Sequence, residues 1–274
     1  MADVIIENPI INSPFKEPER HFRFNEDGIT NQIINKRRVS AYFVPIPNPK
    51  KKTTQQLLFQ TEWTNDRLKE NDFINRVRQQ VKQWRMGGYV HITNTTRKLL
   101  SYWQNEDRYR RLFFCQIEAI ETIIYLTEVA KSYGGAWIED TLKAENDAAN
   151  HDLFRIAMKM ATGSGKTLVM AMLIAYHTLN KAAYPQDNRF SDAFLIVTPG
   201  ITIRDRLRVL FPNDPGNYYR LHDLVPAELM DQLQRARIVI TNFHAFIRRE
   251  QIWGGYSLVD TSLPYFELQW TKII

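Results

Sequence analysis

The chain has 274 residues, enough for one or two domains with a sizeable core. Its formal net charge of +6 permits a polyanionic partner without requiring one. Cys115 is the only cysteine, which excludes an intrachain disulfide, and the histidines show no metal-ligand spacing, which argues against a structural zinc site. The N-terminus lacks the basic and apolar regions of a signal peptide, and the longest apolar run, Leu168–Leu179, is too short to span a bilayer. We therefore expect a cytoplasmic protein without a membrane partner.

The first 54 residues are expected to form an extended or irregular arm. Six prolines between Pro9 and Pro49 interrupt any helix. The aromatic residues between Phe15 and Phe43 are nevertheless too frequent for a disordered tail, so we expect small hairpin elements in this arm. The cluster Lys50–Lys52 is either a phosphate contact or an ordinary solvated charge run.

Residues 55–110 are predicted to be a helical region. Apolar side chains recur at helical spacing up to Trp84, with Asn71 or Thr64 as caps and Gly87–Gly88 as the end. A second helix is predicted over Thr95–Asn105, a third follows up to about Val129, and residues 132–150 form a loop or a partly helical insert. The basic residues of the first helix could follow a nucleic-acid backbone or form a plain exposed face. They are Arg76, Arg78, Lys82 and Arg85.

The stretch Met160–Thr167 carries the clearest chemistry. It follows the alternating apolar run Phe154–Lys159 and precedes the apolar segment Leu168–Leu179, an order that predicts strand, glycine loop and buried helix. Gly163 and Gly165 let the backbone curl so that successive N–H groups point at one phosphate. The helix that follows turns its positive end toward the same anion. The sequence therefore predicts a nucleotide site at this loop.

Two later apolar runs are predicted to be strands buried on both faces of a parallel sheet. They are Ala193–Val197 and Arg237–Ile240, with helical segments between them. This alternation of strands and helices predicts a doubly wound α/β sheet. Ligands of such sheets gather at the carboxyl ends of the strands, where this chain places the glycine loop, Thr198–Gly200 and Thr241–Asn242.

These motifs, in this order, resemble the front motifs of superfamily 2 helicases. They are Gln116–Ala119, Met160–Thr167, Val197–Pro199 and Ile240–His244. Within that group they are most similar to the helicase-type restriction subunit of type III restriction enzymes and its DEAD/DEAH-like relatives. The stretches Asn12–Phe22 and Tyr42–Pro47 also resemble the start of long bacterial restriction endonucleases. The resemblance implies a P-loop NTPase fold with a RecA-like doubly wound parallel sheet over residues 111–274.

The resemblance also implies roles for individual residues. Gln116 would read the adenine edge, or it is an ordinary glutamine of an amphipathic helix. Lys166 and Thr167 would hold the phosphates, with the Thr167 hydroxyl as a ligand of Mg²⁺. The full ATP-binding loop would be Ala161, Thr162, Gly163, Ser164, Gly165, Lys166 and Thr167.

Sequence-independent DNA contacts are implied at the two strand ends. They would be made by Thr198, Pro199, Gly200, Thr241 and Asn242. A helix cap and a strand-end turn explain Thr198–Gly200 almost as well, and His244 is expected to pack rather than to bind. In the family, ATP hydrolysis drives DNA translocation coupled to endonucleolytic cleavage, and a methyltransferase subunit is a possible partner.

One motif of a working motor is missing. An Asp-Glu pair that holds magnesium and activates water should end the next strand. Here Thr261 follows Asp260 where the glutamate should stand. We therefore expect residues 111–274 to be a first motor domain truncated before that motif, in the N-terminal part of a longer protein. Such a chain would bind ATP but hydrolyse it very poorly by itself.

Two other functions compete with this interpretation. A non-catalytic nucleotide- or nucleic-acid-binding module would need no Asp-Glu pair. Another P-loop enzyme, such as a kinase, would have no use for the backbone-contact turns at Thr198–Pro199 and Thr241–Asn242.

Overall fold

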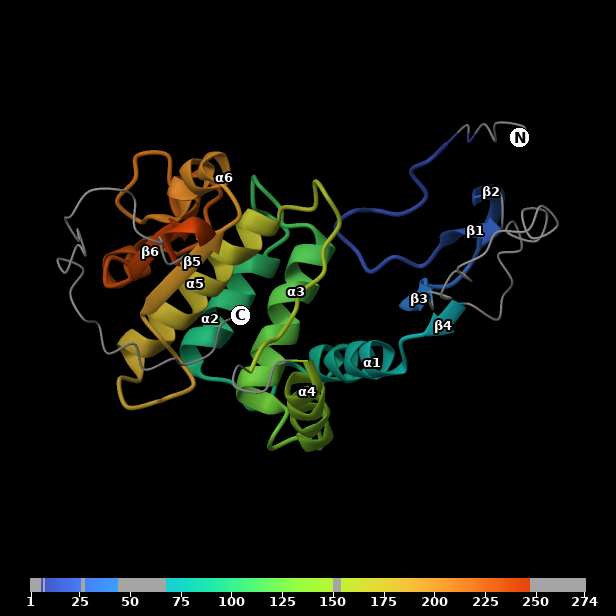
Figure 1. Cartoon of the computed structure of the whole chain (residues 1–274), viewed down its shortest axis with the longest axis horizontal. Helices are drawn as coiled ribbons and strands as arrows, with labels where there is room; N and C mark the ends of the chain where they lie inside the picture. The colour runs from blue at the N-terminus through green and yellow to red at the C-terminus, as the bar shows by residue number, and fades with distance from the viewer. Residues whose placement is uncertain (1–5, 7, 26–27, 44–67, 150–153, 247–274) are drawn as a thin grey trace, which may run out of the picture. The chain divides into compact units, whose positions relative to one another are not determined.

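The computed structural model describes residue 6 and residues 8–25, 28–43, 68–149 and 154–246 (Figure 1). The chain divides into two compact units. The first is Met1–Val90 with Leu112–Glu118, and the second is His91–Arg111 with Ala119–Ile274.

The first unit contains two small antiparallel pairs of strands. They are β1 (His21–Asn25) with β2 (Gly28–Ile34), and β3 (Ala41–Phe43) with β4 (Leu68–Glu70). The expected hairpin elements in the N-terminal arm are confirmed by the antiparallel strands β1 and β2, where Asn25 pairs with Gly28. Gly28 has φ of 117°, in the left-handed region that favours glycine. The cluster Lys50–Lys52 lies outside the described residues.

Helix α1 (Asp72–Met86) completes the first unit. The Asn71 side chain accepts a hydrogen bond from the Ile74 N–H at 3.3 Å, which confirms Asn71 as a cap, and Gly87 is the C-cap, which confirms the predicted end. Val77, Val81 and Trp84 are buried at helical spacing. The part of the predicted helix before residue 68 lies outside the described residues. Leu68–Glu70, also predicted to be helical, is instead strand β4, because its backbone pairs with that of β3.

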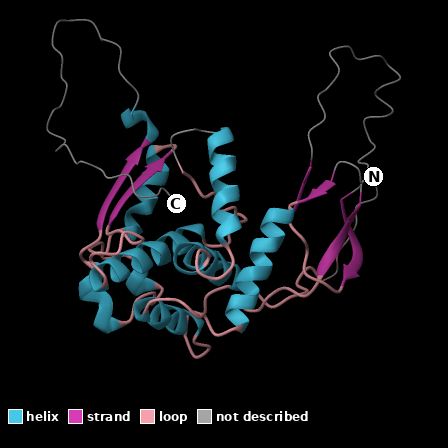
Figure 2. Cartoon of the chain, turned by 90° about the horizontal axis from the view of Figure 1, so that it is seen from below, coloured by secondary structure: helices cyan, strands magenta, loops and turns pink. Residues whose placement is uncertain are grey.

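The second unit is mainly helical (Figure 2). Its longer elements are α2 (Asn94–Gln104), α3 (Phe114–Ile124, which begins in the first unit), the π-helical turn η3 (Tyr125–Val129), α4 (Ala136–Ala149) and α5 (Lys166–Ala183). The second predicted helix is confirmed as α2, and the undecided segment after the third helix is helical as α4.

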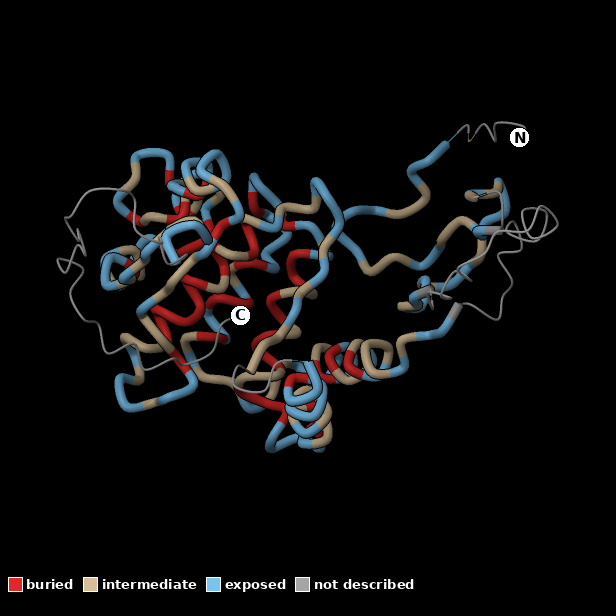
Figure 3. Tube along the Cα trace, viewed as in Figure 1, coloured by how far each residue is buried: buried red, intermediate tan, exposed pale blue. Residues whose placement is uncertain are grey.

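Helix α5 lies at the centre of the second unit. Most of its residues from Leu168 onwards are buried, and it contacts α2 and the shorter helices α7 (Tyr218–Leu221) and α8 (Met230–Leu233) (Figure 3). In the described part of the chain, no helix has the length and apolar character needed to cross a bilayer.

Strands β5 (Ala193–Thr198) and β6 (Arg237–Asn242) run parallel, as predicted. Their register pairs Ala193 with Arg237 and Thr198 with Asn242, so both strands end side by side. Short helices connect and follow them. These are α6 (Ile201–Arg206), η4 (Leu207–Leu210), α7, η5 (Ala227–Leu229), α8 and η6 (Phe243–Phe246).

Two predictions about strands are wrong. Residues 154–160 form no strand, and only Arg155 makes an isolated bridge. The side chain of Asn146 takes both backbone groups of Arg155: its Oδ1 accepts from the N–H at 2.7 Å, and its Nδ2 donates to the carbonyl at 2.9 Å. Nor are β5 and β6 buried on both faces, since Val197 is 49% exposed and Val239 55%. The larger doubly wound sheet stays a prediction.

Candidate nucleotide-binding site

The glycine loop between residues 160 and 166 adopts the curled backbone that its sequence predicts. Gly163 has φ of 79° and Gly165 has φ of 83°, both in the left-handed region. A Cβ added at Gly163 would meet no atom within 4 Å, so glycine is required there by backbone conformation and not by crowding. Both glycines lie just before Lys166, the first residue of α5.

One backbone carbonyl accepts hydrogen bonds from two side chains of the loop. The Ala161 oxygen accepts from the Ser164 hydroxyl at 2.7 Å and from the Lys166 ammonium at 2.8 Å. The Lys166 ammonium has three N–H donors and the residue is exposed, so its charge is available at the mouth of the loop. Ala161, Thr162 and Gly163 are exposed as well.

The N-terminus of α5 is open to an anion. Gly165 is the N-cap residue and makes no side-chain cap hydrogen bond. The first N–H groups of a helix have no partner within the helix, and the aligned peptide dipoles give this end a partial positive charge. Thr167 lies half-buried in the first turn, where its hydroxyl is next to these groups along the chain.

The ends of β5 and β6 are joined by a buried hydroxyl. Thr198 is 3% exposed, and its Oγ1 lies 3.0 Å from the Gly200 carbonyl oxygen and 3.3 Å from that of Thr241. The Asn242 Oδ1 accepts from the Ala245 N–H at 3.1 Å and so begins η6. The structure therefore brings together the five residues expected to contact DNA, and it gives Thr198 and Asn242 backbone partners of their own.

Gln116 lies in the first turn of α3 and is 4% exposed. Its Oε1 accepts a hydrogen bond from the Phe113 N–H at 2.9 Å, which is a helix-capping contact. Gln116 belongs to the first compact unit, whereas the glycine loop belongs to the second.

Two further expectations concern the end of the chain. His244 is exposed, and its ring centroid lies 5.1 Å from that of Phe243. Asp260 and Thr261 lie outside the described residues. Within the described ranges, no group of three His, Cys, Asp or Glu side chains could hold a metal ion.

A buried polar network behind α5 was not predicted. Glu128 lies in the π-helical turn and is 6% exposed. Its carboxylate accepts from the Thr93 N–H at 2.7 Å, the Thr96 hydroxyl at 2.7 Å and the Tyr176 hydroxyl at 2.9 Å. Burial and the charge of Glu128 raise the pKa of Tyr176 well above its ordinary value. The network ties α5 to α2 and η3. The glutamate within the apolar stretch Ile123–Val129 was the available signal in the sequence.

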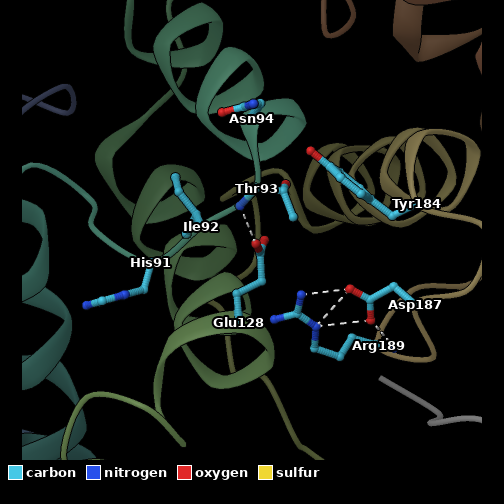
Figure 4. A pocket seen from close by; sticks show the side chains of 8 residues that line it. All are labelled: His91, Ile92, Thr93, Asn94, Glu128, Tyr184, Asp187 and Arg189. Atoms are coloured by element: carbon cyan, nitrogen blue, oxygen red, sulfur yellow. Dashed lines mark hydrogen bonds and ion pairs between the residues drawn. The ribbon is translucent and has the colours of Figure 1, made fainter.

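A cavity of about 360 Å³ opens beside this network (Figure 4). The start of α2 and Glu128 line one side, and the loop after α5 lines the other with Tyr184, Asp187 and Arg189. Arg189 Nη2 lies 2.7 Å from Asp187 Oδ2, so the two charges on this loop compensate each other.

Two left-handed glycines that lead into a long buried helix form the geometry of a phosphate-binding loop, and parallel strands follow it. These are features of the class of P-loop proteins. The family model described as "Type III restriction enzyme, res subunit" matches residues 110–261, and this match implies the helicase-like form of that fold. The match covers more than half of the chain, which therefore belongs to this family of ATP-dependent, helicase-like restriction subunits. No curated protein and no solved structure matches the chain significantly.

Proposed function

We propose that the chain binds ATP with Mg²⁺ and contacts DNA, as the ATP-binding part of a restriction helicase. The glycine loop is the main support for ATP binding, because its two left-handed glycines lead into a helix N-terminus that has no side-chain cap. Residues 161–167 would surround the phosphates. Lys166 would move from the Ala161 carbonyl to the outer phosphates, and Thr167 would add its hydroxyl to the Mg²⁺ shell.

Gln116 would contact the adenine base in this proposal. Its carboxamide oxygen has two lone pairs, so it can accept from the base while it accepts from the Phe113 N–H. The nucleotide domain would extend over residues 111–274, after the arm of residues 1–54 and the helical region of residues 55–110.

DNA would lie against the carboxyl ends of β5 and β6. The shared strand end supports this, because register places Thr198 beside Asn242 and Val197 beside Thr241. Contacts from Thr198, Pro199, Gly200, Thr241 and Asn242 would address the sugar-phosphate backbone and so be independent of sequence. In the whole protein these contacts would serve ATP-driven translocation and cleavage, with a methyltransferase subunit as a partner.

The test is a titration of the chain with a fluorescent ATP analogue and Mg²⁺. Lys166→Ala removes a charge-assisted contact of about 1.5–3 kcal/mol, so affinity should fall about tenfold or more. Lys98→Ala removes an exposed lysine of α2 and should leave the affinity unchanged. Equal affinity of Lys166→Ala and the wild type would refute the proposal. DNA binding that neither ATP nor Lys166→Ala affects would favour the non-catalytic binding module instead.

A further inference from the structure

A cluster of charged side chains lies within the first compact unit, around the ring of Phe114. Arg37 holds Glu118 with two hydrogen bonds, from Nη1 at 2.6 Å and from Nη2 at 2.5 Å. The guanidinium carbons of Arg37 and Arg85 lie 5.6 Å and 5.1 Å from the centroid of the Phe114 ring. These contacts give the cluster a fixed frame on α1 and the start of α3.

Glu17 joins the basic side chains of this cluster. Its Oε1 lies 3.1 Å from Arg37 Nη1, and its Oε2 lies 3.2 Å from Lys82 Nζ and 3.8 Å from Arg85 Nη1. Three of the cationic groups thus share the two carboxylates of Glu17 and Glu118.

A fourth cation, Arg78, belongs to the same cluster without sharing those carboxylates. It is half-buried, and within the described part of the chain no carboxylate forms an ion pair with it. Burial lowers the pKa of Arg78, and the positive charge of Arg37 lowers it further, while Glu118 opposes both. The cluster therefore holds more positive than negative charge, and Arg78 is its cation without a carboxylate in an ion pair among the described residues.

Lys82 lies one helical turn after Arg78, so the two side chains share a face of α1. Its side chain is 52% exposed and can be reached from solvent. A guanidinium offers a fork of N–H donors and an ammonium adds a point charge, a combination that matches the oxygens of a phosphate. A phosphate also brings the negative charge that the cluster lacks.

We infer that Arg78 and Lys82 bind a phosphate group, either of a nucleic-acid backbone or of a small phosphorylated ligand. Arg78 supplies the donors that have no carboxylate partner. Lys82 turns from Glu17 to the ligand, so Glu17 competes with the phosphate for the ammonium. This site is built from residues other than the glycine loop and does not depend on ATP binding.

The inference is tested on the full chain with two probes. The first is a random-sequence DNA duplex, titrated at several salt concentrations and followed by fluorescence anisotropy. The second is inorganic phosphate, added at constant ionic strength while the melting temperature is followed. Arg78→Gln should weaken DNA binding about tenfold, lower the salt slope by about one and reduce the melting-temperature shift that phosphate produces. Arg76→Gln removes an exposed charge from the same helix and should change neither readout appreciably.

A gain of affinity provides a second, independent readout. Glu17→Gln removes the competitor of the phosphate and should strengthen phosphate binding, a result that misfolding cannot produce. Glu19→Gln changes an exposed glutamate two residues away and should not strengthen it. In the Lys166→Ala background, Arg78→Gln should still weaken DNA binding and Glu17→Gln should still strengthen phosphate binding, which separates this site from the proposed ATP site.

The responses of the two probes to Arg78→Gln distinguish the possible ligands. A response with both probes, or with DNA alone, supports a nucleic-acid phosphate, and a response with inorganic phosphate alone supports a small ligand. The inference is overturned if neither probe responds to Arg78→Gln, or if Arg76→Gln has the same effect.

Discussion

Replacement of Glu128 should destabilise the second unit strongly, because a buried acceptor of three hydrogen bonds would be lost. Its partners differ in how they can respond. The Thr93 N–H is fixed at the start of α2, so the loss of its acceptor should cost about 1–3 kcal/mol. The hydroxyls of Thr96 and Tyr176 can rotate, and each loss should cost about 1 kcal/mol. For Glu128→Ala we therefore expect a loss of about 3–5 kcal/mol.

Glu128→Gln separates hydrogen bonding from packing. Its oxygen can keep the two hydroxyl donors, but its NH₂ then faces the Thr93 N–H, so two donors meet. The expected loss is about 1–3 kcal/mol, smaller than for the alanine variant.

Urea unfolding followed by circular dichroism measures both variants. Glu145→Ala, at an exposed position of α4, is the control and should change the free energy of unfolding by no more than about 0.5 kcal/mol. If Glu128→Ala lowered the free energy of unfolding by less than about 1 kcal/mol, the reasoning would be refuted, because buried donors without an acceptor should cost more than that.

Three further predictions follow from single residues. Gly163→Ala places a side chain at φ of 79°, which costs about 1–2 kcal/mol of backbone strain and should weaken ATP binding about tenfold. Gly216→Ala is the control, because Gly216 lies outside the left-handed region, and it should leave ATP affinity unchanged. Equal ATP affinities of Gly163→Ala and the wild type would contradict the loop geometry. Thr198→Val removes a buried hydroxyl between two carbonyls and should lower the free energy of unfolding by about 0.5–1.5 kcal/mol in urea titrations; an unchanged value would show that the hydroxyl does not join the strands. Burial would raise the pKa of Glu17, but hydrogen bonds from two basic neighbours lower it overall below its ordinary 4.5. A carboxyl whose pKa is lower in the folded state stabilises the fold above its unfolded pKa, and this stabilisation is lost as pH falls through the folded pKa. Below about pH 4.5 the wild type should therefore lose more of its free energy of unfolding than Glu17→Gln does.

The helices could be predicted because their signals are local. In α1, the apolar spacing up to Trp84 and the cap at Asn71 lie within the segment itself. The glycine loop could also be predicted, since glycine adopts φ near 80°, as at residues 163 and 165, without the steric strain of other residues.

The strand before the loop could not be predicted in the same way. The alternation of Phe154–Lys159 is a strand signal, but whether a strand forms depends on what takes the backbone groups. Here Asn146, from the preceding helix α4, takes both groups of Arg155. The hydrogen bonds of Glu128 could not be predicted either, because its partners Thr93 and Tyr176 are far away in the sequence.

The position of that network decides what it contributes to the proposed ATP site. Tyr176 is ten residues after Lys166, which places it about 15 Å along α5 from the loop. A hydrogen bond at that distance cannot act on a phosphate directly, but it holds the helix whose N-terminus would face the phosphate. Glu128→Ala should therefore lower the free energy of unfolding while the folded fraction keeps its ATP affinity, whereas Lys166→Ala should do the reverse. If Glu128→Ala weakened ATP binding in a fully folded sample, α5 would be a movable element whose position the network sets.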